Sequence, residues 1–256
     1  MNRTTVSSLS VKEKVISFVW QHILLLISLF LMTFGVALCI RSALGSSVIS
    51  SIPLAMTLAG EAGKAPALTI GDYTNIMNVI LVFCQFLLLR RKFELIQLFQ
   101  LVIGTVFGIL LDVCMFLTEF ISNPNLLTAA GAQIVGCIIL GIGIAFEVKC
   151  GSVTMPGEGM PAAISKLTGI PFAKAKIMVD ISLVIIAVVI GFAYFGKWLW
   201  VVIGPGTLFA MIFVGIVVRF ITPHISWFDH ILCYRPGFRR YIYGLARYTN
   251  KIILKK

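Results

Sequence analysis

Long runs of apolar residues follow one another along the chain, and short polar stretches separate them. Five of these runs cover residues 22–40, 95–117, 127–146, 177–195 and 198–222. A helix that crosses a bilayer needs about 18 or more such residues in succession, and each run meets that length. A sixth, weaker run near 70–89 carries polar groups in its first half, "TIGDYTNIMN". The pattern predicts six transmembrane helices.

Composition supports the membrane class. The 256 residues are 59% hydrophobic and only 12% charged, and the mean hydropathy is +1.02. These values lie far outside the range of soluble globular proteins, which need more polar surface. The first run is longer than the apolar core of a secretory signal and has no A-x-A cleavage site, so we expect a retained helix.

Two glycine-rich interruptions occur at corresponding places. The first, "FGVALCIRSALGSSVISSIPLAMTLAG", covers residues 34–60, and the second, "LGIGIAFEVKCGSVTMPGEGMPAAISKLTG", covers 140–169. The pairs Gly35/Gly141, Gly45/Gly151 and Ser46/Ser152 are each 106 residues apart, and Pro53 and Pro161 fall at similar places. Farther along, "NIMNVILVF" from Asn75 matches "KIMVDISLV" from Lys176, and "GTVF" at 104–107 matches "GTLF" at 206–209. The order of these matches indicates an internal duplication.

Each copy contains one span, a short irregular segment and two more spans. Because three is an odd number, the second copy must have the opposite orientation in the membrane, as in many secondary transporters. The segments Ser46–Ala59 and Glu158–Thr168 are too short to cross about 30 Å of hydrocarbon, and we expect half-helices that enter and return. The fold class predicted is therefore an all-α polytopic membrane protein with two inverted three-helix repeats, each with a re-entrant or broken half-helix. The divisions expected are an N-terminal segment 1–15, repeats 16–123 and 124–225, and a tail 226–256.

Basic residues are distributed unevenly between the two sides of this topology. Of the 21 Lys and Arg residues, 18 lie in the N-terminus, the 90–94 loop, the 147–176 loop and the tail, with Arg219 counted with the tail. An excess of Lys and Arg marks cytoplasmic segments. We expect a protein of the bacterial inner membrane with both termini in the cytoplasm.

The tail "YRPGFRRYIYGLARYTNKIILKK" mixes basic and apolar residues. Such a segment lies on anionic lipid headgroups, each cation adding about 1 kcal/mol near the surface. Membrane lipids are the partner expected. The net charge of +11 gives no reason to expect nucleic-acid binding, because topology accounts for its distribution.

The two interruptions also hold the candidate binding residues. Glycines let a chain turn and approach a ligand closely, Pro161 suits the first turn of a half-helix, and free N–H groups at a helix start bind anions. Serine hydroxyls would add donors, and Arg41 and Lys149 just before the glycines would add positive charge. The substrate-binding residues predicted are Arg41, Gly45, Ser46, Ser47, Lys149, Gly151, Ser152, Gly157, Glu158 and Gly159.

Acidic residues in the spans and in the second interruption are candidates for proton coupling, since a charge at the bilayer centre costs about 2.5–3.5 kcal/mol on insertion scales. The candidates are Glu147, Glu158, Asp112 and Asp180. Ordinary alternatives stay open for each: Glu147 pairs with Lys149 or another cation, Glu158 complements the helix dipole, and the aspartates form ion pairs or lie at headgroup level. Arg41 and Lys149 could equally extend to the interface.

No catalytic constellation is present, so we expect no enzyme activity and no cofactor. Four of the six cysteines, Cys39, Cys84, Cys114 and Cys137, lie in spans, where cysteine is usually a small apolar filler. No metal-ligand spacing such as CxxC occurs, and no metal site is predicted.

Several short motifs resemble the YczE/YitT-type family of bacterial integral membrane proteins, and more closely its YczE branch. They are "ALGSS" at 43–47, "IGTVFGILLD" at 103–112, "PGEGM" at 156–160 and "GTLFAMIFVG" at 206–215. The resemblance spans about residues 30–222 and implies a six-span inner-membrane protein without implying a substrate. Many relatives have proline where this chain has Val48. Glu158 fills the position where relatives often carry an acid.

These observations favour a secondary transporter or exporter of a small anionic or zwitterionic metabolite, with its site between the half-helices near the midplane. The alternative is a membrane scaffold that anchors cytoplasmic partners through the tail, which deletion of residues 236–256 would test. A thiol-redox enzyme using Cys150 is a further rival. Small-residue spacings such as Gly104/Gly108 serve helix packing within one chain or in a homo-oligomer.

Overall fold

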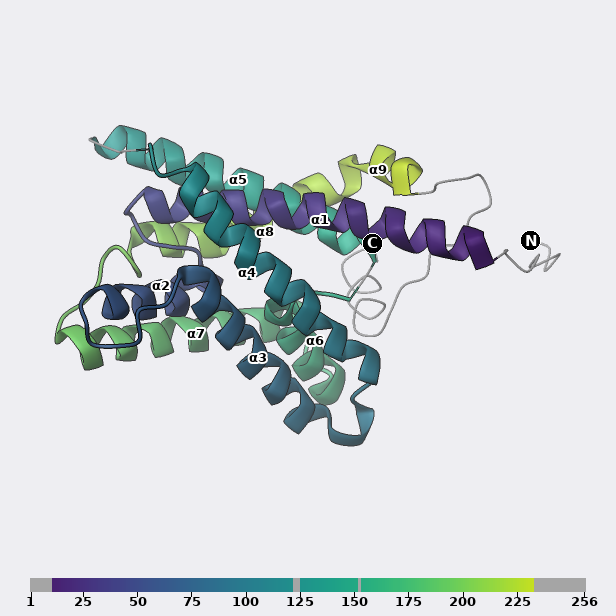
Figure 1. Cartoon of the computed structure of the whole chain (residues 1–256), viewed down its shortest axis with the longest axis horizontal. Helices are drawn as coiled ribbons and strands as arrows, with labels where there is room; N and C mark the ends of the chain where they lie inside the picture. Colours follow the sequence, from purple (N-terminus) through teal and green to yellow (C-terminus); the bar gives the residue numbers. More distant parts are fainter. Residues whose placement is uncertain (1–10, 122–124, 152, 233–256) are drawn as a thin grey trace.

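The computed structural model describes residues 11–121, 125–151 and 153–232, and all regular secondary structure in these ranges is helical. Figure 1 shows the arrangement. The α-helices are α1 (Val11–Arg41), α2 (Val48–Glu61), α3 (Ile70–Leu89), α4 (Phe99–Leu117), α5 (Leu126–Cys150), α6 (Pro156–Thr168), α7 (Phe172–Phe195), α8 (Pro205–His224) and α9 (Ser226–Leu232), and two 3₁₀ turns, η1 (Arg90–Lys92) and η2 (Leu95–Leu98), join α3 to α4.

Six helices are long and apolar enough to cross a membrane, which confirms the number of spans predicted. The apolar stretches are Phe18–Arg41, Ile70–Lys92, Leu95–Leu117, Leu126–Cys150, Phe172–Phe195 and Pro205–His224. Many large apolar side chains on these helices are exposed, as expected for surfaces that face lipid. The chain is a multi-pass membrane protein.

The long helices α1 and α5 lie side by side, as Figure 1 shows at the top of the view. Small residues permit this contact. A Cβ at Gly35 would lie 2.5 Å from the backbone nitrogen of Leu140, and one at Gly136 would lie 2.8 Å from the Gly35 carbonyl oxygen. Close packing on small residues is a usual means of helix association in membranes, where apolar burial gives no driving force.

The short helices α2 and α6 each connect the two halves of the chain. Helix α2 packs on α3 and on α7, and helix α6 packs on α7 and on α3. The remaining contacts between long helices include α1 with α4, α5 with α8, and α3 with α4. At 1.5 Å per residue, α2 and α6 are each about 20 Å long, which is shorter than the hydrocarbon core.

The predicted bounds of these short helices need correction. Helix α2 is Val48–Glu61 rather than Ser46–Ala59, and α6 begins at Pro156 rather than at Glu158. Pro156 occupies the first turn, so the assignment of Pro161 to that place was wrong: Pro161 lies inside the helix. Proline suits the first turn of a helix because its φ is already helical and the N–H that it lacks would have no partner there.

Helices occupy parts of two segments that the sequence analysis placed outside the spans. The segment 147–176 is not one loop, because α5 continues to Cys150, α6 follows, and α7 begins at Phe172. At the other end, α9 lies within the predicted tail and packs on the helical body: Phe228 is buried, and its ring stacks on Phe146 with centroids 4.4 Å apart. The rest of the tail and residues 1–10 lie outside the described residues.

Candidate functional site

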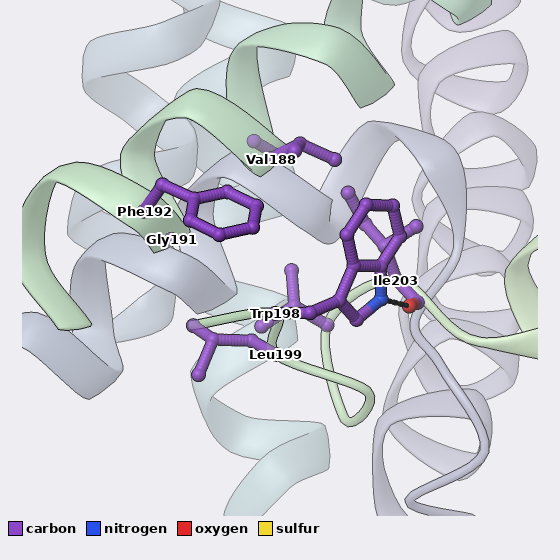
Figure 2. A pocket seen from close by; sticks show the side chains of 8 residues that line it. Val188, Gly191, Phe192, Trp198, Leu199 and Ile203 are labelled. Carbon is purple, nitrogen blue, oxygen red and sulfur yellow. Dashed lines mark hydrogen bonds between the residues drawn. The ribbon is translucent and has the colours of Figure 1, made fainter. Parts of the chain in front are cut away.

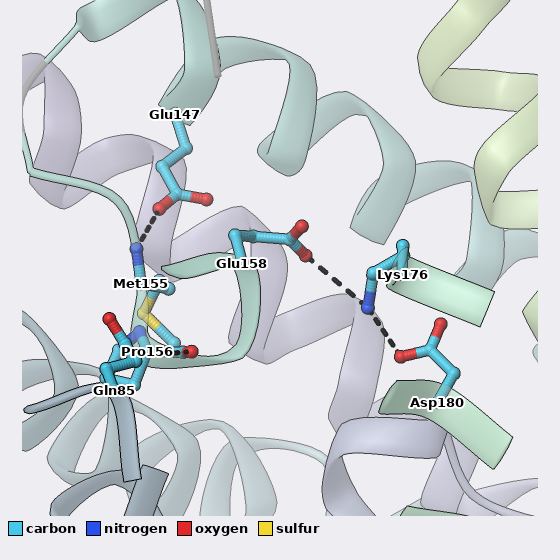
Figure 3. Close-up of polar contacts among 7 residues, drawn as sticks. All are labelled: Gln85, Glu147, Met155, Pro156, Glu158, Lys176 and Asp180. Carbon is cyan, nitrogen blue, oxygen red and sulfur yellow. Dashed lines mark hydrogen bonds and ion pairs between the residues drawn. The ribbon is translucent and has the colours of Figure 1, made fainter. Parts of the chain in front are cut away.

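A cluster of charged side chains lies where α5, α6 and α7 meet, and we call Glu147, Glu158, Lys176 and Asp180 the charged cluster (Figure 3). The Lys176 Nζ lies 2.7 Å from Asp180 Oδ1, one turn farther along α7, and 3.7 Å from Glu158 Oε1 at the start of α6. The side chains of Glu158 and Asp180 are 13% and 11% exposed, and that of Lys176 is 28% exposed. The lysine therefore bridges two largely buried carboxylates.

Glu147 is the most buried member of the charged cluster. It is 3% exposed, and its Oε1 accepts a hydrogen bond of 2.8 Å from the backbone N–H of Met155, just before α6 (Figure 3). Its Oε2 has no hydrogen-bond partner among the described residues, and neither has the hydroxyl of Thr154, which is also buried. Glu158 lies close enough for its charge to act on the Glu147 carboxyl.

Two buried glutamines border the start of α6. Gln85 on α3 and Gln100 on α4 exchange two amide hydrogen bonds of 3.2 Å, and the Gln85 amide also donates to the Pro156 carbonyl over 3.3 Å. A Cβ at Gly159 would lie 2.6 Å from Gln100 Oε1 and 2.8 Å from Gln85 Oε1. The absence of a side chain at Gly159 thus lets these amides approach the α6 backbone.

The start of α2 meets the start of α6. A Cβ at Gly157 would clash with the Ile49 side chain. Of the serines predicted at this helix start, Ser47 shares a hydrogen bond of 2.7 Å with Ser50, while the Ser46 amide and hydroxyl both donate to the Val202 carbonyl at 3.0 Å. These hydroxyls bind the protein itself.

Arg41 and Asp112 lie away from the charged cluster. The Arg41 guanidinium donates from Nη2 to the Met115 carbonyl at 2.7 Å. Asp112 accepts bonds of 2.7 Å from the Thr69 hydroxyl and 2.8 Å from the Gly71 amide, at the start of α3. Gly71 lies 14 residues from Gln85, or about 21 Å along α3, so the structure does not bring Asp112 to the other coupling candidates.

Lys149 likewise has its own partners. Its Nζ lies 2.6 Å from Asp229 Oδ2 on α9 and 3.0 Å from the Ile225 carbonyl oxygen. The pairing with Glu147 considered from the sequence does not occur among these contacts. Gly151 ends α5 with a φ of +63°, which suits a glycine at a helix C-terminus. Ser152 lies outside the described residues.

Replacing Lys149 by methionine should loosen α9 and leave ligand binding at the charged cluster intact. The change removes the ion pair with Asp229, whose side chain is 50% exposed against 6% for Lys149. Partial exposure limits the expected loss of unfolding free energy to about 1–2 kcal/mol. Melting temperatures of Lys149→Met, Asp229→Asn and the double variant would measure it, and additive losses would contradict the pairing.

An apolar pocket of the structure lies away from the charged cluster. Figure 2 shows a small apolar pocket between α7 and the segment before α8, in which the Trp198 indole donates to the Ile203 carbonyl at 2.8 Å. Gly191 in its wall lies 11 residues beyond Asp180, or about 16 Å along α7. Over the described residues, no group of three or more His, Cys, Asp or Glu could hold a metal ion. Cys39 and Cys137 are in contact, with sulfurs 3.8 Å apart.

Sequence reasoning identified Glu147, Glu158 and Asp180 as candidates and missed three polar neighbours. Lys176 had a detectable signal, since Lys176 and Asp180 are four residues apart and share one helix face. Gln85 and Gln100 belong to different helices, so their pairing follows only from tertiary packing.

Comparison with known proteins places the chain in a family. It is 23% identical over 201 residues to the uncharacterized protein YyaS of Bacillus subtilis (strain 168), a match that covers 78% of this chain and 91% of that protein. No solved structure matches the chain. The model of a family of unknown function, DUF6198, matches residues 19–223, which run from α1 to the end of α8. Since this match includes all six apolar helices and the charged cluster, the chain belongs to the DUF6198 family.

Proposed function

We propose that the protein is a secondary transporter of the bacterial inner membrane that moves a small zwitterionic metabolite. One observation carries the proposal. The starts of two short helices meet at Ile49 and Gly157, beside a largely buried cluster of three acids and one lysine. Broken or re-entrant helices that meet beside charged groups are where secondary transporters bind their substrates, and charges buried at membrane depth are rarely without a role.

An inverted duplication would explain how these helices pair. If α1, α2, α3 and α4 correspond to α5, α6, α7 and α8, then each of three contacts has its counterpart: α1 with α4 and α5 with α8, α2 with α3 and α6 with α7, α3 with α6 and α7 with α2. The contact of α3 with α4 lacks a counterpart as extensive. A twofold axis between the repeats would produce this arrangement, in which the short helix of each half packs on a long helix of the other half.

The contact of Ile49 with Gly157 fits this relation. Pro53 and Pro161 are 108 residues apart in sequence, and so are Ile49 and Gly157. Equivalent residues of two repeats touch only near the axis that relates them, so this contact supports an axis between α2 and α6. The substrate site would then lie on or near that axis, close to the midplane.

The charges favour a zwitterion over a simple anion. Glu147 already occupies the backbone N–H of Met155 before α6, and an added anion would face Glu158 and Asp180 as well. An ammonium group, in contrast, would be attracted to these carboxylates. The N–H groups at the start of α2, which has no acid in its first turn, would suit the carboxylate of the same molecule.

Orientation and partners are also part of the proposal. The excess of Lys and Arg in alternate segments supports cytoplasmic termini, and the basic tail would lie on anionic lipids. Kinship with YczE-type proteins is also part of the proposal, because "PGEGM" and "GTLFAMIFVG" resemble their motifs. In this proposal the protein catalyses no chemical reaction and needs no cofactor.

Glu158→Gln should abolish the stabilisation that a zwitterionic ligand gives to the purified protein. A ligand at a hundredfold excess over its Kd stabilises by about 2.7 kcal/mol, or about 5–10 °C in melting temperature at this chain length. The measurement is a thermal-shift screen of amino acids, amines and monocarboxylates, with Glu61→Gln as control, because Glu61 is exposed at the end of α2.

Two results would contradict the proposed function. If no compound of the panel stabilises a well-folded protein, the transport proposal loses its support. If monocarboxylates without an amine stabilise as much as amino acids do, the assignment of the substrate as a zwitterion is wrong.

A further inference from the structure

Glu147 differs from the other acids of the charged cluster because no cation among the residues that the structure describes is in contact with it. Lys176 binds Glu158 and Asp180, and Lys149 binds Asp229. Among the described residues, the one hydrogen bond to the Glu147 carboxyl group comes from the Met155 amide to Oε1. The other oxygen, Oε2, accepts none, although the residue is only 3% exposed.

Electrostatics then favour the neutral form of this carboxyl group. An ionised carboxylate taken out of water without a counter-ion is costly, and such groups in proteins usually bind a proton instead. The negative charge of Glu158 nearby adds to that cost. The C-terminal end of a helix also carries a partial negative charge, which disfavours an ionised carboxylate. Glu147 lies three residues before the C-terminal end of α5.

Other ionisable groups do not offset this environment. Among the residues that the structure describes, no charged or titratable side chain on the elements around this end of α5 forms an ion pair with Glu147. These side chains include Lys149 and Cys150 on α5, Glu158 and Lys166 on α6, Lys174, Lys176 and Asp180 on α7, Arg219 and His224 on α8, Asp229 and His230 on α9, and His22 on α1.

We infer that Glu147 is the proton-exchange site of the transporter, and that its proton and the substrate ammonium group occupy the charged cluster in turn. With the cluster empty, Glu147 holds the proton on the carboxyl group. When the ammonium group enters, the O–H bond breaks and the proton passes to water on the side to which the site is open. One positive charge replaces another, so the charge within the charged cluster stays constant through the exchange, while the carboxylate of the substrate lies outside the cluster at the start of α2. This inference rests on the proposed function.

A metal cation is a poorer occupant than a proton. Sodium and similar hard cations need several oxygen ligands at once. Within the described residues, the fully buried side-chain oxygens near this point that lack partners are Glu147 Oε2 and Thr154 Oγ1. A proton requires only one of them.

The test is a pH jump on the full chain reconstituted in liposomes on a solid-supported membrane, with no substrate present. The probe is the proton itself. Wild-type protein should give a transient charge displacement, Glu147→Gln should reduce it at least tenfold, and Glu61→Gln should leave it unchanged. An equal displacement in wild type and Glu147→Gln would overturn the assignment, and so would no displacement in wild type.

A second variant covers the case in which Glu147→Gln does not fold. Glu147→Asp keeps the carboxyl group and should retain the displacement with an altered pH dependence. Infrared spectra should show a protonated carboxylic acid band near neutral pH in wild type that shifts in Glu147→Asp. A band and displacement both identical to wild type would overturn the inference.

The two proposals fail in different ways. If an amine ligand stabilises the protein but a pH jump displaces no charge, the proton site is wrong and the transport function stands. If charge is displaced while no ligand is found, protons bind at Glu147 and the substrate class is wrong.

Discussion

Replacing Lys176 with methionine should destabilise the protein and abolish ligand binding together. The substitution leaves Glu158 and Asp180, 13% and 11% exposed, without the cation that lies between them. Breaking a fully buried ion pair costs about 3–5 kcal/mol. Because the Lys176 side chain is 28% exposed, we expect a loss of about 2 kcal/mol, or about 4–8 °C in melting temperature.

Matched variants separate the charge balance from the function of this lysine. Adding Glu158→Gln and Asp180→Asn to Lys176→Met removes all three charges. We therefore expect the triple variant to recover most of the melting temperature that Lys176→Met loses, while stabilisation by a ligand stays absent. Lys176→Arg keeps the charge and should retain more stability than methionine does. A Lys176→Met protein that melts as wild type does would show that the bridge contributes nothing.

The spans were predictable from the sequence because each depends on a local property. A run such as 127–146 is recognised from its own residues, and α5 (Leu126–Cys150) differs from it by only a few residues at each end. The same holds for the two short helices, whose glycines and prolines mark an interruption wherever the chain folds. The error at the start of α6 arose because two prolines, Pro156 and Pro161, both suit a helix start and the sequence alone did not decide between them.

The site was predictable only in part because its contacts are not local. Lys149 appeared to be available for a ligand, but Asp229, 80 residues later, engages it. The amide pair of Gln85 and Gln100 follows from how α3 packs against α4, and no spacing indicates it. Sequence patterns could therefore indicate which charges lie in the membrane, and only the packing decides which of them meet.

Gly45→Ala should destabilise the protein through both backbone strain and a steric clash. Gly45 has a φ of +121°, and a Cβ there would lie 2.5 Å from Thr207 Oγ1 and 2.7 Å from the Gly204 amide nitrogen. Backbone strain of about 1–3 kcal/mol adds to a packing cost of about 1–3 kcal/mol. We expect a total of about 3 kcal/mol, or about 6–12 °C in melting temperature.

Two control substitutions separate these causes. Gly169 has a φ of +74° and nothing within 4 Å of an added Cβ, so Gly169→Ala isolates the backbone strain. Gly131 also has open space and lies inside α5, where alanine is favoured by about 0.5–1 kcal/mol. If Gly45→Ala costs no more stability than Gly169→Ala, the close approach to α8 is not a constraint.

If Gly45→Ala costs more stability than Gly169→Ala, the start of α2 is fixed by its contact with α8, because the next residue, Ser46, donates two hydrogen bonds to the Val202 carbonyl just before that helix. Ligand stabilisation should then fall as well, since Ile49 and the α2 N–H groups proposed to hold the substrate follow directly in the chain.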